Sequence, residues 1–486
     1  MTRWPSTTWA LFCWGTLCLA PLQAQNLTLQ TTRLQVQTQA GVPDLQCTAP
    51  KLPVRPPQRV DPDPVEVPDD DQVSDQVQAF LKASSSAPLV QNPGRSGAAS
   101  AAIPAMNGQI LRVGIWGDSH VAAAFWTQEL LRLSQLRPEQ MHTRFVPANM
   151  NRPGVRLPLR KSCLGPDWRH EPAHVAKLDV APSGPGLVQL ASLQNGAWLA
   201  WDIRQPSGRA DKKWLRLQYL QTAQTLTLRV RVDGAAAYQV SLKGPEGPAA
   251  LDLWSDAPIS TVEVTVLDGP WRLQGLEWSV PESTRLQMDV FAFPGATVAG
   301  WRQVDPEKLR LWWDEPPYDW VVLAFGTNEG NATVFDAQAY TKMLQEAVAS
   351  WRQVFPHTAC LLVAPGDRGV LVRRSQKTGQ KSNRTPPDVL RYTRVHDEIG
   401  RIQKQVAQAN GCHAWSMFEA MGGAGSAYRW ARHNPPLMAR DLIHFTVPGY
   451  QRLAQLMAQD LGWGPALFDS LPLPLPLPLP SPAANR

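Results

Sequence analysis

The chain has 486 residues, enough for roughly three domains of about 150 residues each. Hydrophobic residues make up 43% of it and charged residues only 18%, a balance that excludes a wholly disordered chain. The net charge is +6 and the sequence pI is near 9.0, but no run of Lys or Arg forms the basic stripe of a nucleic-acid-binding protein. We therefore expect no nucleic-acid partner.

The first 24 residues contain one charge, Arg3, and an apolar stretch from Trp9 to Leu22 that is followed by Gln-Ala. This pattern is typical of a secretory signal peptide cleaved after Ala24. The apolar stretch is shorter than a membrane-spanning helix. We therefore expect an exported protein with no transmembrane segment after cleavage.

Export would place the four remaining cysteines in an oxidising compartment, where they allow three complete pairings. Cys360 and Cys412 each begin an apolar run that predicts a strand, and neighbouring strands bring Cα atoms within disulfide range. We predict a disulfide between Cys360 and Cys412, which leaves Cys47 to pair with Cys163.

The two ends of the mature chain differ in composition from its middle. Residues 25–101 form an N-terminal extension with Pro-rich linkers, including an extended tether over 48–68. An amphipathic helix is predicted over 69–83, with an apolar face made of Val73, Val77, Phe80 and Leu81. Residues 466–486 form a Leu-Pro-rich tail that favours polyproline II.

Between these ends, apolar strands alternate with helices over residues 102–152 and again over 286–465. The predicted strands are 110–116, 288–293, 320–325, 360–364 and 412–415. The predicted helices between them begin near His120 and cover 299–312, 335–354 and 387–409. Apolar strands separated by helices predict a five-stranded parallel sheet covered on both faces, which is a three-layer αβα sandwich of the α/β class.

Residues 153–285 interrupt this alternation with a different pattern. Their strands alternate apolar and polar residues, with turn signals at Asp233-Gly234 and Asp268-Gly269, and this predicts an inserted antiparallel β-sandwich. The insert is rich in tryptophans, which either fill its core or offer flat faces to sugar rings. These are Trp168, Trp198, Trp201, Trp214, Trp254, Trp271 and Trp278.

A Gly-Asp-Ser-His motif at residues 117–120 ends the first strand of the α/β domain and opens a helix. A serine on such a turn exposes its hydroxyl, and its own N–H lies at the positive end of the helix, where an oxyanion is stabilised. Ser119 is therefore either a nucleophile or an ordinary helix N-cap.

Two further strands carry motifs at their carboxyl ends, which lie at the same edge of the sheet as Ser119. Phe-Pro-Gly at 293–295 closes the second strand, and Gly295 can bring a bare backbone N–H close to a reacting carbonyl. Gly-Thr-Asn-Glu at 326–329 closes the third strand, where the Asn328 amide either donates to an oxyanion or only stabilises the turn.

Asp441 and His444 precede a final helix. A carboxylate three residues before a histidine can accept from one imidazole nitrogen while the other nitrogen takes a proton from a serine. Thr446 and Pro448 signal the start of this helix. Its apolar face consists of Tyr450, Leu453, Met457 and Leu461.

In this order and placement, the four motifs resemble those of the SGNH (GDSL-like) hydrolase family, over residues 110–150 and 286–462. The resemblance implies that Ser119 is the nucleophile and that Asp441 orients His444, the general base and acid. It also implies an oxyanion hole made of Ser119, Gly295 and Asn328.

One residue departs from the family pattern. Glu329 stands where the third motif often has Asp, which affects the local turn packing rather than the role of the asparagine. The inserted sandwich, the Gly-Thr-Asn-Glu motif, and the stretches at 421–426 and 441–450 are most similar to secreted peptidoglycan O-acetylesterases of Gram-negative bacteria.

This closer resemblance implies a periplasmic serine esterase without a cofactor. Its substrate would be O-acetylated peptidoglycan, from whose N-acetylmuramic acid it would remove acetyl groups through an acyl-enzyme. The insert would be a carbohydrate-binding-like jelly roll. The sequence leaves open a peptidoglycan or polysaccharide O-acetyltransferase, another carbohydrate acyl esterase, and a non-enzymatic glycan-binding cell-wall protein.

Two other histidine patterns lie in the insert. His-Glu-Pro-Ala-His at 170–174 matches a zinc-protease pattern, but Pro172 interrupts the helix that the pattern needs, so we expect no metal site. Asp167 and His170 repeat the spacing of the last motif without a following helix, and we treat this as chance. The sequence does not predict an oligomeric state.

Overall fold

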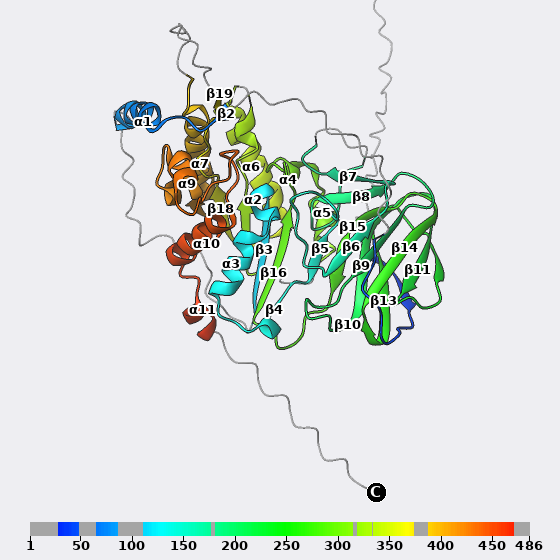
Figure 1. Cartoon of the computed structure of the whole chain (residues 1–486). Helices are drawn as coiled ribbons and strands as arrows, with labels where there is room; N and C mark the ends of the chain where they lie inside the picture. The colour runs from blue at the N-terminus through cyan, green and yellow to red at the C-terminus, as the bar shows by residue number, and fades with distance from the viewer. Residues whose placement is uncertain are drawn as a thin grey trace, which may run out of the picture.

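The computed structural model describes residues 28–47, 65–85, 110–175, 180–313, 318–332, 334–373 and 387–470. The predicted signal peptide, most of the 48–68 tether, the linker after residue 85 and the tail from residue 471 lie outside the described residues. The described residues form an α/β domain and a β-rich domain, which lie side by side (Figure 1).

A six-stranded, wholly parallel sheet forms the centre of the α/β domain. Its order is β20 (His413–Ser416), β18 (Ala359–Ala364), β17 (Trp320–Ala324), β3 (Leu111–Gly117), β16 (Leu286–Ala292) and β4 (Met141–His142). The prediction of five strands was therefore wrong by one. The additional strand, β4, has only two residues and pairs with the start of β16, so it is too short to show a hydrophobic period.

Helices cover both faces of this sheet and enclose two separate hydrophobic cores. One face is covered by α2 (Ser119–Ala122), α3 (Phe125–Leu133), α8 (Met417–Met421), α9 (Ser426–Arg432), α10 (Val447–Leu461) and α11 (Pro465–Asp469). The other is covered by α4 (Gly300–Gln303), α5 (Pro306–Arg310), α6 (Ala337–Val354) and α7 (Arg391–Ala409). Because both faces are covered, every residue of β17 is buried.

Two of the helical regions that the sequence predicts as continuous are broken. The helix after Ser119 is interrupted at Ala124, which has a φ of 61°. The helix near 299–312 divides after Gln303, and Asp305 caps a new one by accepting from the N–H groups of residues 307 and 308. Both breaks arise from local backbone geometry that a hydrophobic period does not reveal.

The β-rich domain consists of two sheets with one hydrophobic core between them. The first has β1 (Gln30–Gln35), β13 (Gly247–Ile259), β10 (Lys212–Gln221), β15 (Arg272–Trp278), β8 (Val188–Ser192) and β7 (Trp168–Pro172), with β5 (Phe145–Pro147) beside β15. The second has β12 (Tyr238–Leu242), β11 (Leu226–Val232), β14 (Thr261–Asp268), β9 (Trp198–Asp202) and β6 (Lys161–Leu164). The jelly-roll assignment stays a prediction.

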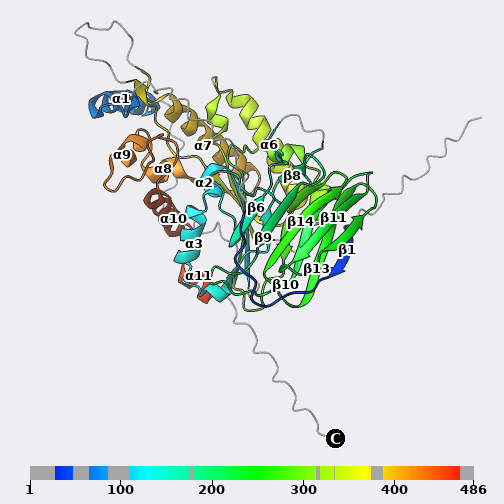
Figure 2. The same cartoon turned by 45° about the vertical axis from the view of Figure 1, so that its right-hand side comes forward.

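The N-terminal extension contributes to both domains. Strand β1 adds to the outer edge of the first sheet and is parallel to β13, whereas the other pairings in the two sheets are antiparallel (Figure 2). Helix α1 (Asp70–Ser85) packs on the α/β domain through Val73, Val77 and Phe80. Leu81, predicted on the same face, is instead 49% exposed. A short pair, β2 (Val65–Glu66) with β19 (Val372–Arg373), accompanies this contact.

Both predicted disulfides are confirmed. Cys360 and Cys412 join the starts of the neighbouring strands β18 and β20, with Cα atoms 4.9 Å apart. Cys47 and Cys163, with Cα atoms 5.3 Å apart, attach the N-terminal extension to β6 of the insert. Among the described residues, no helix combines the length and apolarity needed to cross a bilayer.

Most tryptophans of the insert serve its core. Four of the seven are buried, and two more are partly buried. Of these seven tryptophans, Trp254 alone is exposed, with 38% of its surface accessible. The core therefore accounts for most of the tryptophan content of this region, and one surface position remains for a ligand.

Candidate active site

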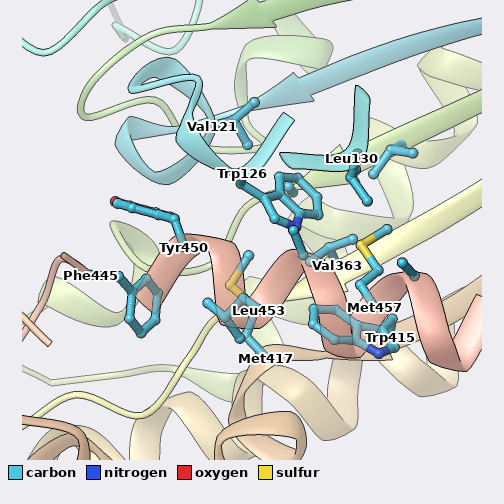
Figure 3. Close-up of a cluster of buried hydrophobic side chains, with 14 of the residues drawn as sticks. Val121, Trp126, Leu130, Val363, Trp415, Met417, Phe445, Tyr450, Leu453 and Met457 are labelled. Atoms are coloured by element: carbon cyan, nitrogen blue, oxygen red, sulfur yellow. The ribbon is translucent and has the colours of Figure 1, made fainter. Parts of the chain in front are cut away.

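Helix α10, which is followed by the short α11, brings His444 to Ser119, although the two residues are 325 positions apart. The apolar face of α10 predicted from the sequence is confirmed, since Tyr450, Leu453, Met457 and Leu461 are all buried. This face packs against a cluster that includes Trp126 and Leu130 of α3 (Figure 3). Because α3 follows the Ser119 turn and α10 follows the His444 turn, this packing fixes the distance between the turns.

Ser119, His444 and Asp441 form a chain of hydrogen bonds. The Oγ of Ser119 lies 3.0 Å from Nε2 of His444, and Nδ1 of His444 lies 2.7 Å from Oδ2 of Asp441. Both distances are within hydrogen-bond range without any movement of the chain. The geometry is that of a nucleophile, a base and an orienting carboxylate, and it can support acyl transfer through a serine.

The turn from Asp441 to His444 is held by the backbone as well as by side chains. Oδ1 of Asp441 accepts from the N–H groups of Ile443 and His444, each at 3.0 Å. Leu442 adopts a left-handed φ of 55° inside this turn, and its carbonyl accepts from the N–H of Gly369 at 3.0 Å. The turn is therefore braced from both sides, and the carboxylate cannot rotate away from the imidazole without losing three hydrogen bonds.

These contacts set the charges of the two groups. Burial alone would raise the pKa of Asp441, but the hydrogen bonds from His444 and the turn hold it well below its usual value. The hydrogen bond to Asp441 raises the pKa of His444 above 6.5, while burial and the nearby charge of Arg368 oppose that rise. Asp441 is thus ionised at neutral pH, and His444 is a stronger base than a free imidazole.

Gly295 and Asn328 lie on the two loops that follow β16 and β17. Gly295 has a φ of 88°, a conformation that favours glycine, and a Cβ built there would have no atom within 4 Å. Nδ2 of Asn328 donates to the carbonyl of Ala296 at 2.9 Å, which links the two loops and leaves a second amide hydrogen for a ligand. The N–H of Ser119 belongs to the first turn of α2, where helix N–H groups lack partners within the helix.

Glu329 also connects these two loops, through hydrogen bonds to their backbone. Its carboxylate is buried and accepts from the N–H of Val298 at 2.9 Å and from the N–H of Gly326 at 3.1 Å, one on each oxygen. Burial raises the pKa of Glu329 to about 7. Sequence reasoning identified this residue only as a departure from the family pattern. The structure shows that the departure supplies the brace between the loops of Gly295 and Asn328.

The other members of the first motif have structural contacts. Asp118 is buried and caps α2 by accepting from the N–H of His120 at 2.9 Å, and burial raises its pKa to about 6. His120 is also buried, with Nδ1 lying 3.2 Å from the hydroxyl of Tyr450, and burial lowers its pKa to about 3. His120 is therefore neutral and points to α10 rather than to Ser119, as expected for a helix-start residue.

The His-Glu-Pro-Ala-His segment lies in and just after β7, so its two histidines are not on adjacent turns of a helix. Both imidazole rings face Phe293, with ring centroids 6.0 Å and 5.9 Å away. Nε2 of His170 lies 3.0 Å from the carbonyl of Met150. The insert therefore meets the α/β domain beside the Gly295 loop and forms one wall next to the candidate active site.

Comparisons with known proteins agree with this architecture. Residues 268–452 match the profile described as the GDSL-like Lipase/Acylhydrolase family, a range that contains Gly295, Asn328, Asp441 and His444. Ser119 lies outside that range because the insert separates it from the rest of the domain. None of the curated proteins matches the sequence.

Among solved structures, one described as "Peptidoglycan O-acetylesterase in action, 5 min" has 23% sequence identity and a TM-score of 0.54, covering 75% of this chain and 93% of that one. A Bacillus subtilis protein has 14% identity and a TM-score of 0.28, covering 62% and 90% of the two chains. A family two carbohydrate esterase from Cellvibrio japonicus has 12% identity and a TM-score of 0.22, covering 62% and 98%.

The fold and the site define a carboxylic ester hydrolase. More particularly, residues 268–452 are similar to the GDSL-like Lipase/Acylhydrolase family, and a β-rich insert interrupts the α/β domain to which most of them belong.

Proposed function

We propose that this protein is a periplasmic serine esterase that removes O-acetyl groups from the N-acetylmuramic acid of peptidoglycan. The observation that carries the proposal is the hydrogen-bond chain of 3.0 Å and 2.7 Å through Ser119, His444 and Asp441. The fold shared with the structure described as a peptidoglycan O-acetylesterase supports the choice of substrate.

In the proposed reaction, His444 takes the proton of Ser119 as the hydroxyl attacks the acetyl carbonyl. The N–H groups of Ser119 and Gly295 and the amide of Asn328 stabilise the oxyanion. His444 then returns the proton to the sugar oxygen, which leaves an acetyl-enzyme. Water then attacks this ester while His444 takes a proton from it. His444 returns that proton to the Oγ of Ser119 as the ester bond breaks, and acetate leaves.

The openness of the site favours an acyl group attached to a polymer. The side chains of His444 and Asp441 are 42% and 46% exposed, so the reacting atoms lie near the surface. A long acyl chain would need a deep apolar tunnel to bury its length, whereas an acetyl group on a glycan strand needs only a shallow recess. The same openness would admit a sugar hydroxyl in place of water, which keeps an O-acetyltransferase as the second candidate.

The test is the release of acetate from O-acetylated peptidoglycan, with base-deacetylated peptidoglycan as the blank. We expect Ser119→Ala to reduce kcat/KM by at least about 1,000-fold, because only the residual effects of binding and oxyanion contacts remain. Release unchanged by this substitution would reject the serine mechanism. Addition of a chitooligosaccharide acceptor separates the two candidates, since acetylation of the acceptor that outpaces acetate release would identify a transferase.

A further inference from the structure

Three arginines from two segments lie around the candidate active site, and each guanidinium lies over an aromatic ring. The guanidinium carbon of Arg152 is 5.0 Å from the ring centre of Phe293, which leads into the Gly295 loop. That of Arg156 is 4.1 Å from the ring centre of Phe125. Stacking of this kind holds a guanidinium in a fixed orientation and leaves its N–H groups at the edge for a ligand.

The third is Arg368, whose guanidinium carbon is 3.9 Å from the ring centre of Tyr392. The next residue, Gly369, donates its N–H to the carbonyl of Leu442, so Arg368 is attached directly to the turn that holds His444. One terminal nitrogen of Arg368 donates to Asn331. Its Nε is buried and has no hydrogen-bond partner among the described residues.

The segment that carries Arg152 and Arg156 crosses the site from one side to the other. Near its start, the Asn149 amide donates to the carbonyl of Ala292 at 2.7 Å, at the end of β16. At its end, the N–H of Arg156 donates to the carbonyl of Ala122 at 3.0 Å, in the helix that begins with Ser119. The two arginines are thus anchored to the oxyanion loop and to the nucleophile helix.

These three cations lack the partners that other arginines of this chain have. Within the described part of the chain, none of the three forms an ion pair with a carboxylate, whereas Arg144, Arg204 and Arg216 all do. Burial also lowers the pKa of Arg368, and the charge of the nearby Asp441 opposes this effect without reversing it. Guanidinium groups that are fixed around one reactive centre and form no carboxylate ion pair are the arrangement that binds an anionic ligand.

We propose that Arg152, Arg156 and Arg368 form a carboxylate-binding rim, which makes the enzyme selective for acetyl esters on glycans that carry carboxylates. The proposal rests on the esterase function above and specifies its substrate. In peptidoglycan the carboxylate has two sources: the lactyl group of the acetylated sugar, when its peptide has been removed, and the stem peptide itself. Bidentate carboxylate recognition is common to both.

The experiment compares kcat and KM for acetate release from three substrates: O-acetylated glycan stripped of peptides, the same glycan with its peptides, and a neutral O-acetylated chitooligosaccharide. We expect the wild type to favour a carboxylate-bearing glycan over the neutral one by at least about 10-fold in kcat/KM, and added salt to narrow that gap. Preference for the stripped glycan identifies the lactyl carboxylate, and preference for the peptide-bearing glycan identifies the stem peptide.

We expect Arg368→Gln to raise KM for the preferred glycan about 10-fold. The ratio of kcat/KM between that glycan and the neutral substrate should fall accordingly. Arg368→Lys keeps the charge and should recover part of this loss, which a purely structural role would not predict. Arg33→Gln is the matched control, because Arg33 is exposed on β1, at the opposite edge of its sheet from β7, and forms no ion pair among the described residues.

Failure of this proposal is distinguishable from failure of the esterase function. Equal kcat/KM for all three substrates, together with Ser119-dependent acetate release, would overturn the rim and leave the esterase intact. If no substrate releases acetate, the rim is tested by measuring the affinity of the Ser119→Ala protein for the stripped glycan and for the neutral glycan. Tighter binding of the stripped glycan that Arg368→Gln weakens supports the rim, and equal binding of both glycans overturns it.

Discussion

Two carboxylates beside the candidate active site and two in the β-rich domain differ in their hydrogen-bond donors. In the α/β domain, Glu329 accepts only backbone N–H groups in the hydrogen bonds resolved, and Asp118 caps a helix N–H. In the β-rich domain, Asp202 accepts from Nε of Arg204 at 2.9 Å, and Asp252 accepts from Nε of Arg216 at 2.7 Å. The first arrangement shapes loops, whereas in the second an arginine neutralises the carboxylate, and the Arg216–Asp252 pair also joins β10 to β13.

The difference follows from what each region does. A loop at the carboxyl edge of a parallel sheet must keep its backbone N–H groups aimed at one point, and a small carboxylate can gather them without occupying the site. Burial without a cation then raises the pKa of Glu329 to about 7 and that of Asp118 to about 6. Arginine hydrogen bonds instead hold the pKa of Asp202 below its usual value against the effect of burial. The ionisation of Glu329 and Asp118 should therefore change with pH near neutrality, whereas Asp202 should stay ionised there.

The largest expected effect concerns the two Asp-x-x-His spacings, one in each region. Asp441→Asn should lower kcat/KM by about 1,000- to 10,000-fold, because the imidazole loses its orienting acceptor. Activity requires neutral His444 and so falls as pH decreases through its pKa, which Asp441 raises above 6.5. The acidic limb of the pH–rate profile should therefore move to lower pH in the variant.

Asp167→Asn is the matched control for that experiment, since Asp167 also lies three residues before a histidine but belongs to the insert. Its Oδ1 accepts from Nε2 of Gln194 rather than from His170, whose Nε2 lies beside the carbonyl of Met150. We expect this variant to keep both its rate and its pH profile. Equal losses in the two variants, or an acidic limb that stays in place in Asp441→Asn, would contradict the assigned role.

A smaller loss is expected at the oxyanion position. Asn328→Ala should reduce kcat by about 100- to 1,000-fold with little change in KM, because the amide acts on the charge that develops in the transition state. Asn195→Ala is the control, since this amide belongs to the insert and bonds to Asp268. Steady-state kinetics on a small acetyl ester would measure both, and a KM effect without a kcat effect would remove Asn328 from the proposed oxyanion hole.

Much of the α/β domain could be predicted because its signals are local. Strands buried on both sides appear as continuous apolar runs, and each motif follows such a run, so the positions of Ser119, Gly295 and Asn328 at one sheet edge follow from chain order. The face of α10 and the Cys360–Cys412 disulfide were predictable for similar reasons, and the Cys47–Cys163 disulfide then followed by elimination.

The features that sequence reasoning missed depend on contacts between distant segments. Strand β1 joins β13 across more than 200 positions, and nothing in its six residues identifies that partner. The brace made by Glu329 depends on Val298 in another loop. The arginine rim unites two segments that lie far apart in the sequence, one with Arg152 and Arg156 and the other with Arg368.

The next prediction tests the two kinds of buried carboxylate directly. Glu329→Gln should reduce kcat about 10-fold, since the amide loses one of the two N–H groups that tie the oxyanion loops together. The folded state binds the Glu329 proton more tightly than the unfolded state does, so this group favours folding at low pH and loses that contribution as pH rises from about 4.5 to about 7. Unfolding free energy should thus fall less steeply over this window in the variant.

Asp202→Asn should behave in the opposite sense. The pKa of Asp202 is lowered in the folded state, so its contribution to stability is present above the usual aspartate value of 3.8 and is lost only as pH falls below it. The variant should be less stable than the wild type at pH 7, with the difference shrinking in acid. Urea unfolding from about pH 2 to pH 8 covers the windows of both groups, and parallel curves for the two variants would show that the distinction between the regions has no energetic consequence.

The smallest expected effect concerns the surface of the insert. Trp254 pairs across strands with the partly buried Trp214, and such a pair offers an aromatic platform on one face of the sheet. In the Ser119→Ala background, which avoids turnover, Trp254→Ala should weaken binding to insoluble peptidoglycan by about 5-fold, the effect of one lost aromatic contact of about 1 kcal/mol. Leu193→Ala is the control, because Leu193 is an aliphatic side chain of the same domain that is 56% exposed. If both substitutions weaken binding equally, surface hydrophobicity rather than stacking holds the glycan, and if neither does, all contact with the substrate belongs to the hydrolase edge and its arginines.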